Sequence, residues 1–225
     1  MNTTLLEKNF KRMGANVDIH VAPHDLHSVN VLENRKESRF VVTVPDLDDC
    51  EVLDVQPDQR HLLLMIRSGK EKDKFLCGHD ERAWFAAAVP DGASAVKTAM
   101  ESLKPREVRI AQADKKVKLK KRNKRRNKAF LRQGEWFFVP CLDFDPPDNV
   151  VLHNEPIQRG RGKPHMCEQL VRFGGWNPMR RDPEVYVRGR IRHGDHKTVE
   201  LAVWHRVHQN REIAARGMQH LAFLD

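Results

Sequence analysis

The chain has 225 residues, a net charge of +9 at pH 7 and four cysteines. That length suits one large domain or two small ones. Its first residues, MNTTLLEKNFKRMGAN, lack the apolar run of a signal peptide, and no apolar stretch approaches the length of a membrane span. The composition therefore predicts a cytoplasmic protein that does not associate with membranes, with reduced cysteines serving as core residues or metal ligands.

The first thirty residues are predicted to form an irregular arm, because they are rich in histidine and interrupted by Pro23. Residues 31–110 are predicted to form a small α+β domain, in which a small antiparallel sheet is covered by one helix. Its strands are expected at 39–44, 61–68, 74–78 and 83–90. The helix is expected over 94–103, with Ser94 as its N-cap and Pro105 just beyond its end.

Residues 111–131 form the basic segment, and residues 132–225 are predicted to form a β-rich domain. Strands are expected at 135–140, 150–156 and 165–171, followed by a hairpin of 185–193 and 198–208. Short strands separated by Pro and Gly turns are typical of a small barrel or sandwich. A short helix is expected over 210–223. The fold class is therefore α+β.

Four blocks of the sequence carry a resemblance: GHDERAWF, NKAFLRQGEWFFVP, NEPIQRGRGKPHMCE and VYVRGRIRHGDHKTVEL. They resemble a group of uncharacterised bacterial proteins over roughly residues 30–225. The C-terminal half is also similar to shorter phage-associated proteins that share the RQG strand and a pair of histidines in place of His165 and Cys167. The resemblance implies that these blocks belong together and implies no activity.

Residues 115–128, KKVKLKKRNKRRNK, contain ten Lys and Arg and no acidic residue. The ten are Lys115, Lys116, Lys118, Lys120, Lys121, Arg122, Lys124, Arg125, Arg126 and Lys128. The rest of the chain is close to neutral, so this segment alone makes the protein basic. We expect it to be a helical or disordered linker, since repulsion between like charges opposes an isolated helix, and to bind nucleic acid through phosphates. RNA is slightly preferred over DNA because the run is rich in Arg and Asn. An inert linker and binding to anionic lipid remain alternatives.

A second basic cluster follows at Arg159, Arg161 and Lys163, separated by glycines. Glycine permits close approach of the backbone to a phosphate, so these residues are further candidates for nucleic-acid contact. The spacing is not that of a P-loop, and a flexible strand connection explains the cluster equally well.

A histidine and cysteine set in the C-terminal half has the spacing of metal ligands. His165 and Cys167 lie two residues apart on one predicted strand, and His193 and His196 flank a Gly-Asp turn. Together they would supply three nitrogens and one sulfur, a closed ligand set suited to structural zinc. Buried or surface histidines and a small apolar cysteine are the alternative reading.

Catalysis is a further hypothesis. His193, Asp195, His196 and Lys197 place a base, a carboxylate and a cation together, as a metal-dependent nuclease or related hydrolase would require. A four-ligand zinc would leave no open position for this chemistry. A third hypothesis is a structural interaction protein with an inert basic linker. The sequence indicates no particular protein partner.

Overall fold

The computed structural model describes residues 3–22, 27–33, 37–81, 83–90, 92–158, 163–173 and 184–211. The described residues divide into two compact units, whose boundary lies between Leu103 and Lys104. The N-terminal unit contains the residues up to Leu103 and also Arg211, and the C-terminal unit contains Lys104–Asn210. Among the described residues, no helix has the length and apolarity needed to cross a membrane.

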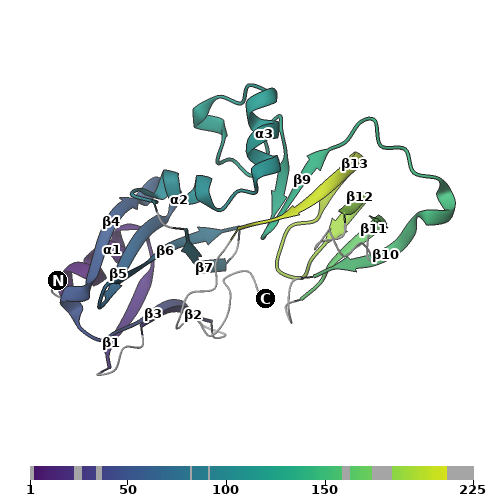
Figure 1. Cartoon of the computed structure of the whole chain (residues 1–225). Helices are drawn as coiled ribbons and strands as arrows, with labels where there is room; N and C mark the ends of the chain where they lie inside the picture. Colours follow the sequence, from purple (N-terminus) through teal and green to yellow (C-terminus); the bar gives the residue numbers. More distant parts are fainter. Residues whose placement is uncertain are drawn as a thin grey trace. The chain divides into compact units, whose positions relative to one another are not determined.

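The N-terminal unit contains two sheets and two helices (Figure 1). In chain order the elements are α1 (Thr3–Arg12), β1 (Asn16–Val21), β2 (Ser28–Glu33), β3 (Ser38–Val44), β4 (Cys50–Gln56), β5 (His61–Ser68), β6 (Glu71–Asp80), β7 (Ala83–Val89) and α2 (Val96–Ser102). Strands β4 to β7 form an antiparallel meander, and β3 lies between β1 and β2 in the smaller sheet. The predicted antiparallel sheet with a helix at 94–103 is confirmed for the strands at 61–68, 74–78 and 83–90. The strand predicted at 39–44 is β3 and lies in the second sheet, and β4 was not predicted.

Residues 1–30 were predicted to be irregular, and that prediction is wrong for the described part of the segment. Helix α1 buries Leu6 and Phe10, one turn apart on the same face, and Phe10 packs against Phe40 of β3 at 5.1 Å between ring centroids. This i, i+4 spacing is what an amphipathic helix requires. Strand β1 then pairs in parallel with β3, which ties the start of the chain into the unit.

The N-cap of α2 also differs from the prediction. The cap residue is Ala95, and the carboxylate of Asp54 on β4 accepts a hydrogen bond of 2.9 Å from the Val96 amide. A carboxylate favours the positive end of a helix, but here it comes from a strand 42 residues earlier. Ser94 therefore does not serve as the cap.

The C-terminal unit is built on one six-stranded antiparallel sheet (Figure 1). Its elements are α3 (Arg106–Asp114), β8 (Leu131–Gln133), β9 (Trp136–Pro140), β10 (Leu152–Ile157), β11 (His165–Phe173), β12 (Glu184–Arg192) and β13 (Val199–Gln209). The strand order is β10-β11-β12-β13-β9-β8. The α+β class and the predicted strands of this half are confirmed.

A closed barrel is not formed among the described residues, because β8 and β10 end the sheet without pairing with each other. The sheet nevertheless has one face lined by a shared apolar core that includes Leu131 of β8 and Ile157 of β10. A hydrogen bond of 2.7 Å from Gln133 Nε2 to the Lys197 carbonyl links β8 to the β12–β13 turn. These contacts bring the two ends of the strand order toward each other and position the histidines described below. The helix predicted over 210–223 falls almost wholly outside the described residues.

Candidate nucleic-acid interface and metal centre

The basic segment is a folded loop rather than a long helix or a disordered linker. We refer to residues 115–128 as the basic loop. Helix α3 ends at Asp114, and the loop then contains a short 3₁₀ turn at Leu119–Lys121 and an isolated β-bridge from Arg126 to Leu131. Backbone hydrogen bonds fix both ends, from Val117 to Gln112 at 2.9 Å and from Arg132 to Arg125 at 2.7 Å.

A buried lysine holds the middle of the basic loop. Lys104 is only 3% exposed, and its ammonium donates hydrogen bonds to Asn123 Oδ1 at 2.7 Å and to the Arg122 carbonyl at 2.9 Å. Its third acceptor is Gln112 Oε1 at 3.3 Å, and Gln112 in turn donates to the same Arg122 carbonyl at 2.7 Å. A buried ammonium is tolerated when its donors are satisfied in this way. Lys104 therefore acts as an internal anchor of the loop.

An apolar cluster attaches the basic loop to α3 and β9. Val117 and Phe130 are almost fully buried together with Val108 of α3 and Phe137 of β9. The Phe130 and Phe137 rings meet edge to face, with centroids 5.1 Å apart. Asn127 Oδ1 accepts hydrogen bonds from the Ala129 and Phe130 amides and so orders the turn that leaves the loop. The loop backbone is thus defined by packing and hydrogen bonding.

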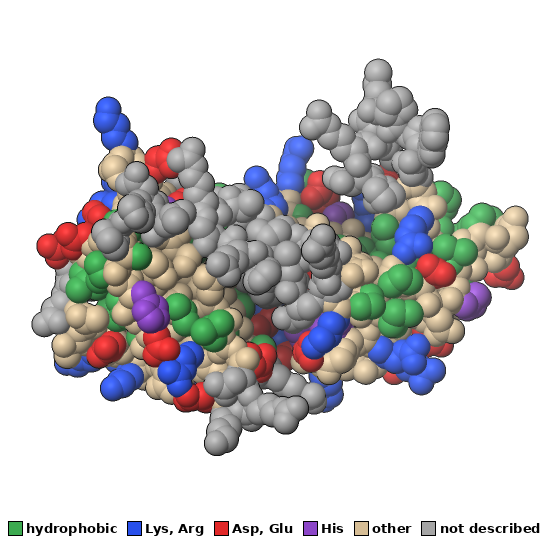
Figure 2. Space-filling model, turned by 90° about the horizontal axis from the view of Figure 1, so that it is seen from below, with side chains coloured by type: hydrophobic (Ala, Val, Ile, Leu, Met, Phe, Trp, Pro, Cys, Tyr) green, Lys and Arg blue, Asp and Glu red, His purple; other side chains and the backbone are tan. Residues whose placement is uncertain are grey.

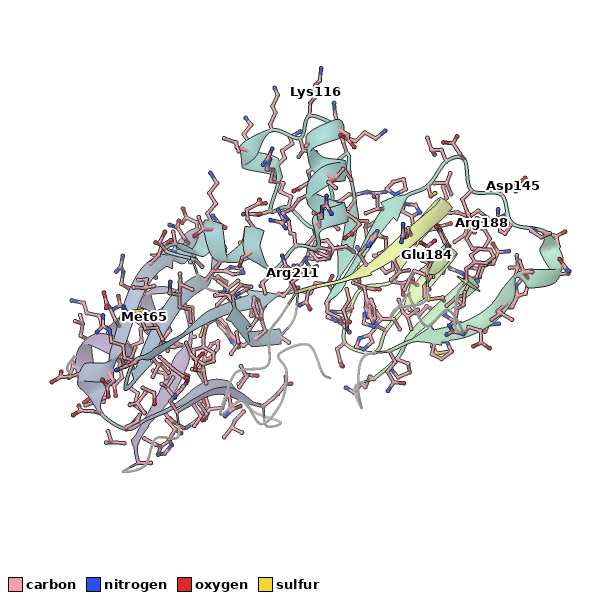
Figure 3. The ribbon with its side chains drawn as sticks, in the orientation of Figure 1. Met65, Lys116, Asp145, Glu184, Arg188 and Arg211 are labelled. Carbon is pink, nitrogen blue, oxygen red and sulfur yellow. The ribbon has the colours of Figure 1, made fainter. Side chains whose placement is uncertain are left out.

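Seven of the ten predicted cations surround a single cavity of about 630 Å³ inside the basic loop. They are Lys116, Lys118, Lys120, Lys121, Lys124, Arg126 and Lys128. All seven are exposed, and none forms an ion pair with a described residue. Figure 3 shows Lys116 at the outer end of the loop, where several lysine and arginine side chains extend away from the ribbon. The face of the molecule in Figure 2 instead carries basic side chains interspersed with acidic ones.

The other predicted contact residues have different positions. Lys115 caps the C-terminus of α3, and Arg122 Nε donates to the Val117 carbonyl at 3.4 Å. Lys163 forms an ion pair of 2.7 Å with Asp195. Arg159 and Arg161 lie outside the described residues, and the backbone carbonyl of Arg125 accepts a hydrogen bond from the Arg132 amide. The cavity therefore holds the cations that are available to a ligand.

Three histidines converge at one end of the six-stranded sheet. His165 begins β11, His193 follows β12, and His196 lies in the β12–β13 turn. Their metal-binding nitrogens lie within 4.8 Å of one another. The imidazole rings are nearly parallel, with centroids 4.2 Å apart for His165 and His193 and 4.6 Å apart for His193 and His196. We refer to these residues as the histidine triad, and it could hold a metal ion.

His165 is the residue of the triad whose surroundings most favour a metal. It is 2% exposed, and neither of its ring nitrogens has a hydrogen-bond partner among the described residues. Burial and the adjacent His193 and His196 lower its pKa to about 3. The ring therefore stays neutral at pH 7, which is the form that coordinates a metal. A buried polar side chain with no partner is costly unless a ligand satisfies it.

Gly134 in the β8–β9 turn leaves space beside the triad. Its φ of +55° is in the left-handed region that favours glycine. A β carbon there would lie 2.9 Å from His196 Nε2 and 3.5 Å from His165 Nε2. Both Nε2 atoms therefore lie close to the Gly134 backbone, where no side chain fills the space. The three imidazole ligands, the unpartnered nitrogens of His165 and this space all fit a metal ion.

Cys167 does not lie with the histidine triad. The prediction of Cys167 as a fourth metal ligand is therefore wrong. The residue is fully buried in the apolar core opposite Ile191, and its thiol contacts the His165 carbonyl at 3.7 Å. Burial raises the pKa of the thiol to about 12, so it remains protonated at pH 7. The two side chains do share a strand face, but two residues correspond to about 6.6 Å along a strand. That distance places the sulfur inside the core.

The remaining candidates for catalysis are close to the triad in sequence but make other contacts. The Asp195 amide donates to His193 Nδ1 at 3.1 Å, while the carboxylate accepts from Lys163 at 2.7 Å. The hydrogen bond from Lys163 lowers the pKa of Asp195. Lys197 has an exposed side chain, and its carbonyl accepts from Gln133.

Three residues of the two sites were not predicted as site residues from the sequence. Lys104 is a single lysine before a proline, and Gln133 and Gly134 are part of an ordinary turn. Only the packing of α3 and the curvature of the sheet bring them to the basic loop and the histidine triad. No known family model, curated protein or solved structure matches this chain. Function is therefore inferred from the two sites themselves.

Proposed function

We propose that the protein binds nucleic acid through the basic loop, and that the histidine triad holds a zinc ion. The observation that supports the first part is the set of seven exposed, unpaired cations around one cavity on a loop with a defined backbone. Like charges at close range repel by about 1 kcal/mol per pair at 4 Å even in water. A ligand with closely spaced negative charges removes this repulsion. The phosphate backbone of a nucleic acid has that property.

The scaffold of the basic loop weighs against an inert linker. A linker needs no buried ammonium and no apolar cluster, yet Lys104 and Phe130 hold this loop in one conformation. A membrane-surface element would need an apolar stripe, whereas Leu119 is the exposed large apolar residue of the loop. The described loop therefore favours a polyanion in solution.

Single-stranded RNA is the preferred ligand. Elements that read duplex DNA are usually long helices or strands that enter the major groove, and the basic loop has neither. Its cations enclose a concave space within the size range of ligand sites, roughly 300–1,000 Å³. A flexible strand can bend its phosphates into such a space more easily than a stiff duplex can.

Charge neutralisation of the loop tests the binding proposal. We expect a variant with six cavity lysines changed to glutamine to bind labelled RNA roughly 10³-fold more weakly or not at all at physiological salt. The six are Lys116, Lys118, Lys120, Lys121, Lys124 and Lys128. A matched control neutralises six exposed cations of the N-terminal unit, Lys8, Lys11, Arg12, Lys70, Lys72 and Lys97. Equal affinity of both variants in fluorescence anisotropy would refute a specific role for the loop.

The zinc assignment rests on three convergent imidazole ligands. Imidazole suits zinc, copper, iron and nickel, and zinc is the one most commonly held by histidine without redox chemistry. Elemental analysis of the protein should give one zinc per chain. We expect His165→Ala to lose the metal and Cys167→Ala to keep it, because only the histidine lies within the triad. Absence of stoichiometric metal from the native protein would remove this part of the proposal.

A further inference from the structure

Among the described residues the histidine triad supplies three ligands, which would leave a tetrahedral zinc with one open position. Structural zinc sites usually have four protein ligands, whereas catalytic sites have three and bind water in the fourth position. Cys167, the residue that could have closed the site, lies in the apolar core opposite Ile191. The triad is the only group of three or more metal-ligating side chains found among the described residues. Its ligand count is therefore that of a reactive centre.

Two residues beside the triad each have a buried polar atom without a hydrogen-bond partner. Gln133 is fully buried, and its Oε1 accepts no hydrogen bond from any described residue. Its Nε2 is held by the Lys197 carbonyl, one residue after His196. The indole Nε1 of Trp136 is also buried without a partner, and this ring meets His165 edge to face at 6.4 Å between centroids.

These atoms are complementary to a bound water molecule. Glutamine Oε1 can only accept a hydrogen bond, and the indole N–H can only donate one. A water molecule on a metal can donate to the first atom and, as hydroxide, accept from the second. Buried polar atoms in native proteins nearly always have partners, including ordered water. The same small region therefore contains metal ligands together with an unsatisfied acceptor and an unsatisfied donor.

We propose that the histidine triad is a hydrolytic zinc centre that cleaves phosphodiester bonds, with Gln133 and Trp136 as positioning residues for the zinc-bound water. The inference rests on the zinc site of the proposed function. The phosphodiester is the substrate class because the same unit presents the cationic cavity of the basic loop. Lys197 is exposed one residue after His196 and carries a positive charge beside the triad, whereas Lys163 is already paired with Asp195.

The reaction is a hydrolysis that needs no further reactant. Zinc lowers the pKa of its bound water to about 7, so hydroxide is available at neutral pH. The hydroxide oxygen forms a bond to phosphorus, and the bond from phosphorus to the leaving ester oxygen breaks. The proton released from the water ends on that leaving oxygen. The products are an alcohol and a phosphate monoester.

Substitution of zinc by cobalt tests for an open coordination position on the metal without a measurement of hydrolysis. The protein with Co²⁺ in place of zinc should show the visible bands of a histidine-bound ion and no thiolate-to-cobalt charge transfer in the near ultraviolet. Addition of inorganic phosphate should change the visible bands, because it replaces a water ligand. A thiolate band that disappears in Cys167→Ala, or a spectrum insensitive to phosphate, would overturn the proposal.

Hydrolysis is measured with bis(4-nitrophenyl) phosphate and with labelled RNA. We expect zinc-dependent turnover of both, abolished by His196→Ala and lowered roughly 10- to 100-fold by Gln133→Leu. Circular dichroism identifies variants that do not fold, and chelation of the native protein followed by zinc addition gives the same comparison without mutation. The variant with six neutralised loop lysines should lose RNA cleavage and keep activity on the small ester. That pattern separates failure of RNA binding from failure of the centre.

Two results overturn the inference. One is a protein with one zinc per chain that hydrolyses the small ester no faster than an equal concentration of free zinc, which leaves only a structural site. The other is a native protein that binds neither zinc nor cobalt. Activity that persists equally in His165→Ala and His196→Ala would identify a contaminating enzyme and count against the proposal as well.

Discussion

The basic loop and the histidine triad belong to the same unit, yet they present their functional groups in opposite ways. The loop places seven charges in solvent on a backbone that is anchored from inside by Lys104. The triad places three imidazole rings close together, with His165 almost fully buried. Exposed charges supply affinity for a polyanion that falls with salt, while buried ligands supply a site of defined chemistry. The comparison indicates that binding and metal chemistry can be disrupted independently.

Loss of the metal should have the largest effect on stability and little effect on RNA affinity. A metal present at 100 times its Kd stabilises the folded state by about 2.7 kcal/mol. For a protein of this size each kcal/mol corresponds to roughly 2–4 °C in Tm. Differential scanning fluorimetry of native protein and His165→Ala, each with and without zinc, should show this shift only in the native protein. RNA affinity that fell in parallel with zinc removal would contradict the separation of the two sites.

Replacement of the loop anchor should weaken the scaffold and leave the cavity charges in place. Lys104→Met removes hydrogen bonds from a buried ammonium, and we expect a loss of about 1.5–3 kcal/mol in urea unfolding. RNA affinity should fall less than in the six-lysine variant, because all seven cavity cations remain. Lys115→Met, at an exposed position, is the control and should have native stability. An unchanged free energy of unfolding for Lys104→Met would mean that the hydrogen bonds of Lys104 do not stabilise the folded protein.

Acidification should destabilise the C-terminal unit through a histidine outside both sites. Burial lowers the pKa of His208 to about 4 from its usual 6.5, with Arg206 as a second cause. Between these values the unfolded chain takes up a proton that the folded protein does not, so the free energy of unfolding falls as pH decreases from 6.5 to 4. The loss is at most about 1.4 kcal/mol per pH unit.

The same titration with two variants isolates this contribution. The His208→Gln protein should have a shallower dependence of stability on pH over this window than the native protein. The exposed His153 serves as the control position, and His153→Gln should retain the native slope. Identical slopes for all three proteins would show that His208 does not report on folding.

Alanine substitution at two glycines with similar backbone angles distinguishes the cost of a left-handed backbone from the effect of crowding against neighbouring atoms. Gly134 and Gly69 have φ values of +55° and +60°, but only Gly134 has atoms near the position of an added β carbon. Alanine at either position should cost about 1–2 kcal/mol from the left-handed backbone. Only Gly134→Ala should also reduce zinc binding, since its methyl group would meet His196 Nε2. Equal zinc content in the two variants would argue against convergence of the ligands at Gly134.

Local patterns predicted most strands of the sheets. Alternation and turn residues located β5, β9 and the β12–β13 hairpin within one or two residues. The sequence was less informative where an element is stabilised by distant partners. Helix α1 depends on contacts with β3, and the cap of α2 comes from Asp54 on another strand. No local signal near either helix reports those contacts.

The same limit applies to the two sites. The charge of the basic loop is evident from composition, but its folded conformation depends on Lys104, Gln112 and Phe130, which lie outside the basic run. Spacing identified all three histidines of the triad, since each follows from a strand or a turn. It wrongly added Cys167, because a shared strand face does not reveal how deep a residue lies in the core.

The salt dependence of RNA binding tests the central claim most directly. If the seven cavity cations each neutralise a phosphate of a single strand, the slope of log K against log salt should be about −5 for the native protein. The variant with six lysines neutralised should have a slope of about −1, and the matched control in the N-terminal unit should keep the native slope. A native slope near zero, or the same slope in the native protein and the loop variant, would contradict the account.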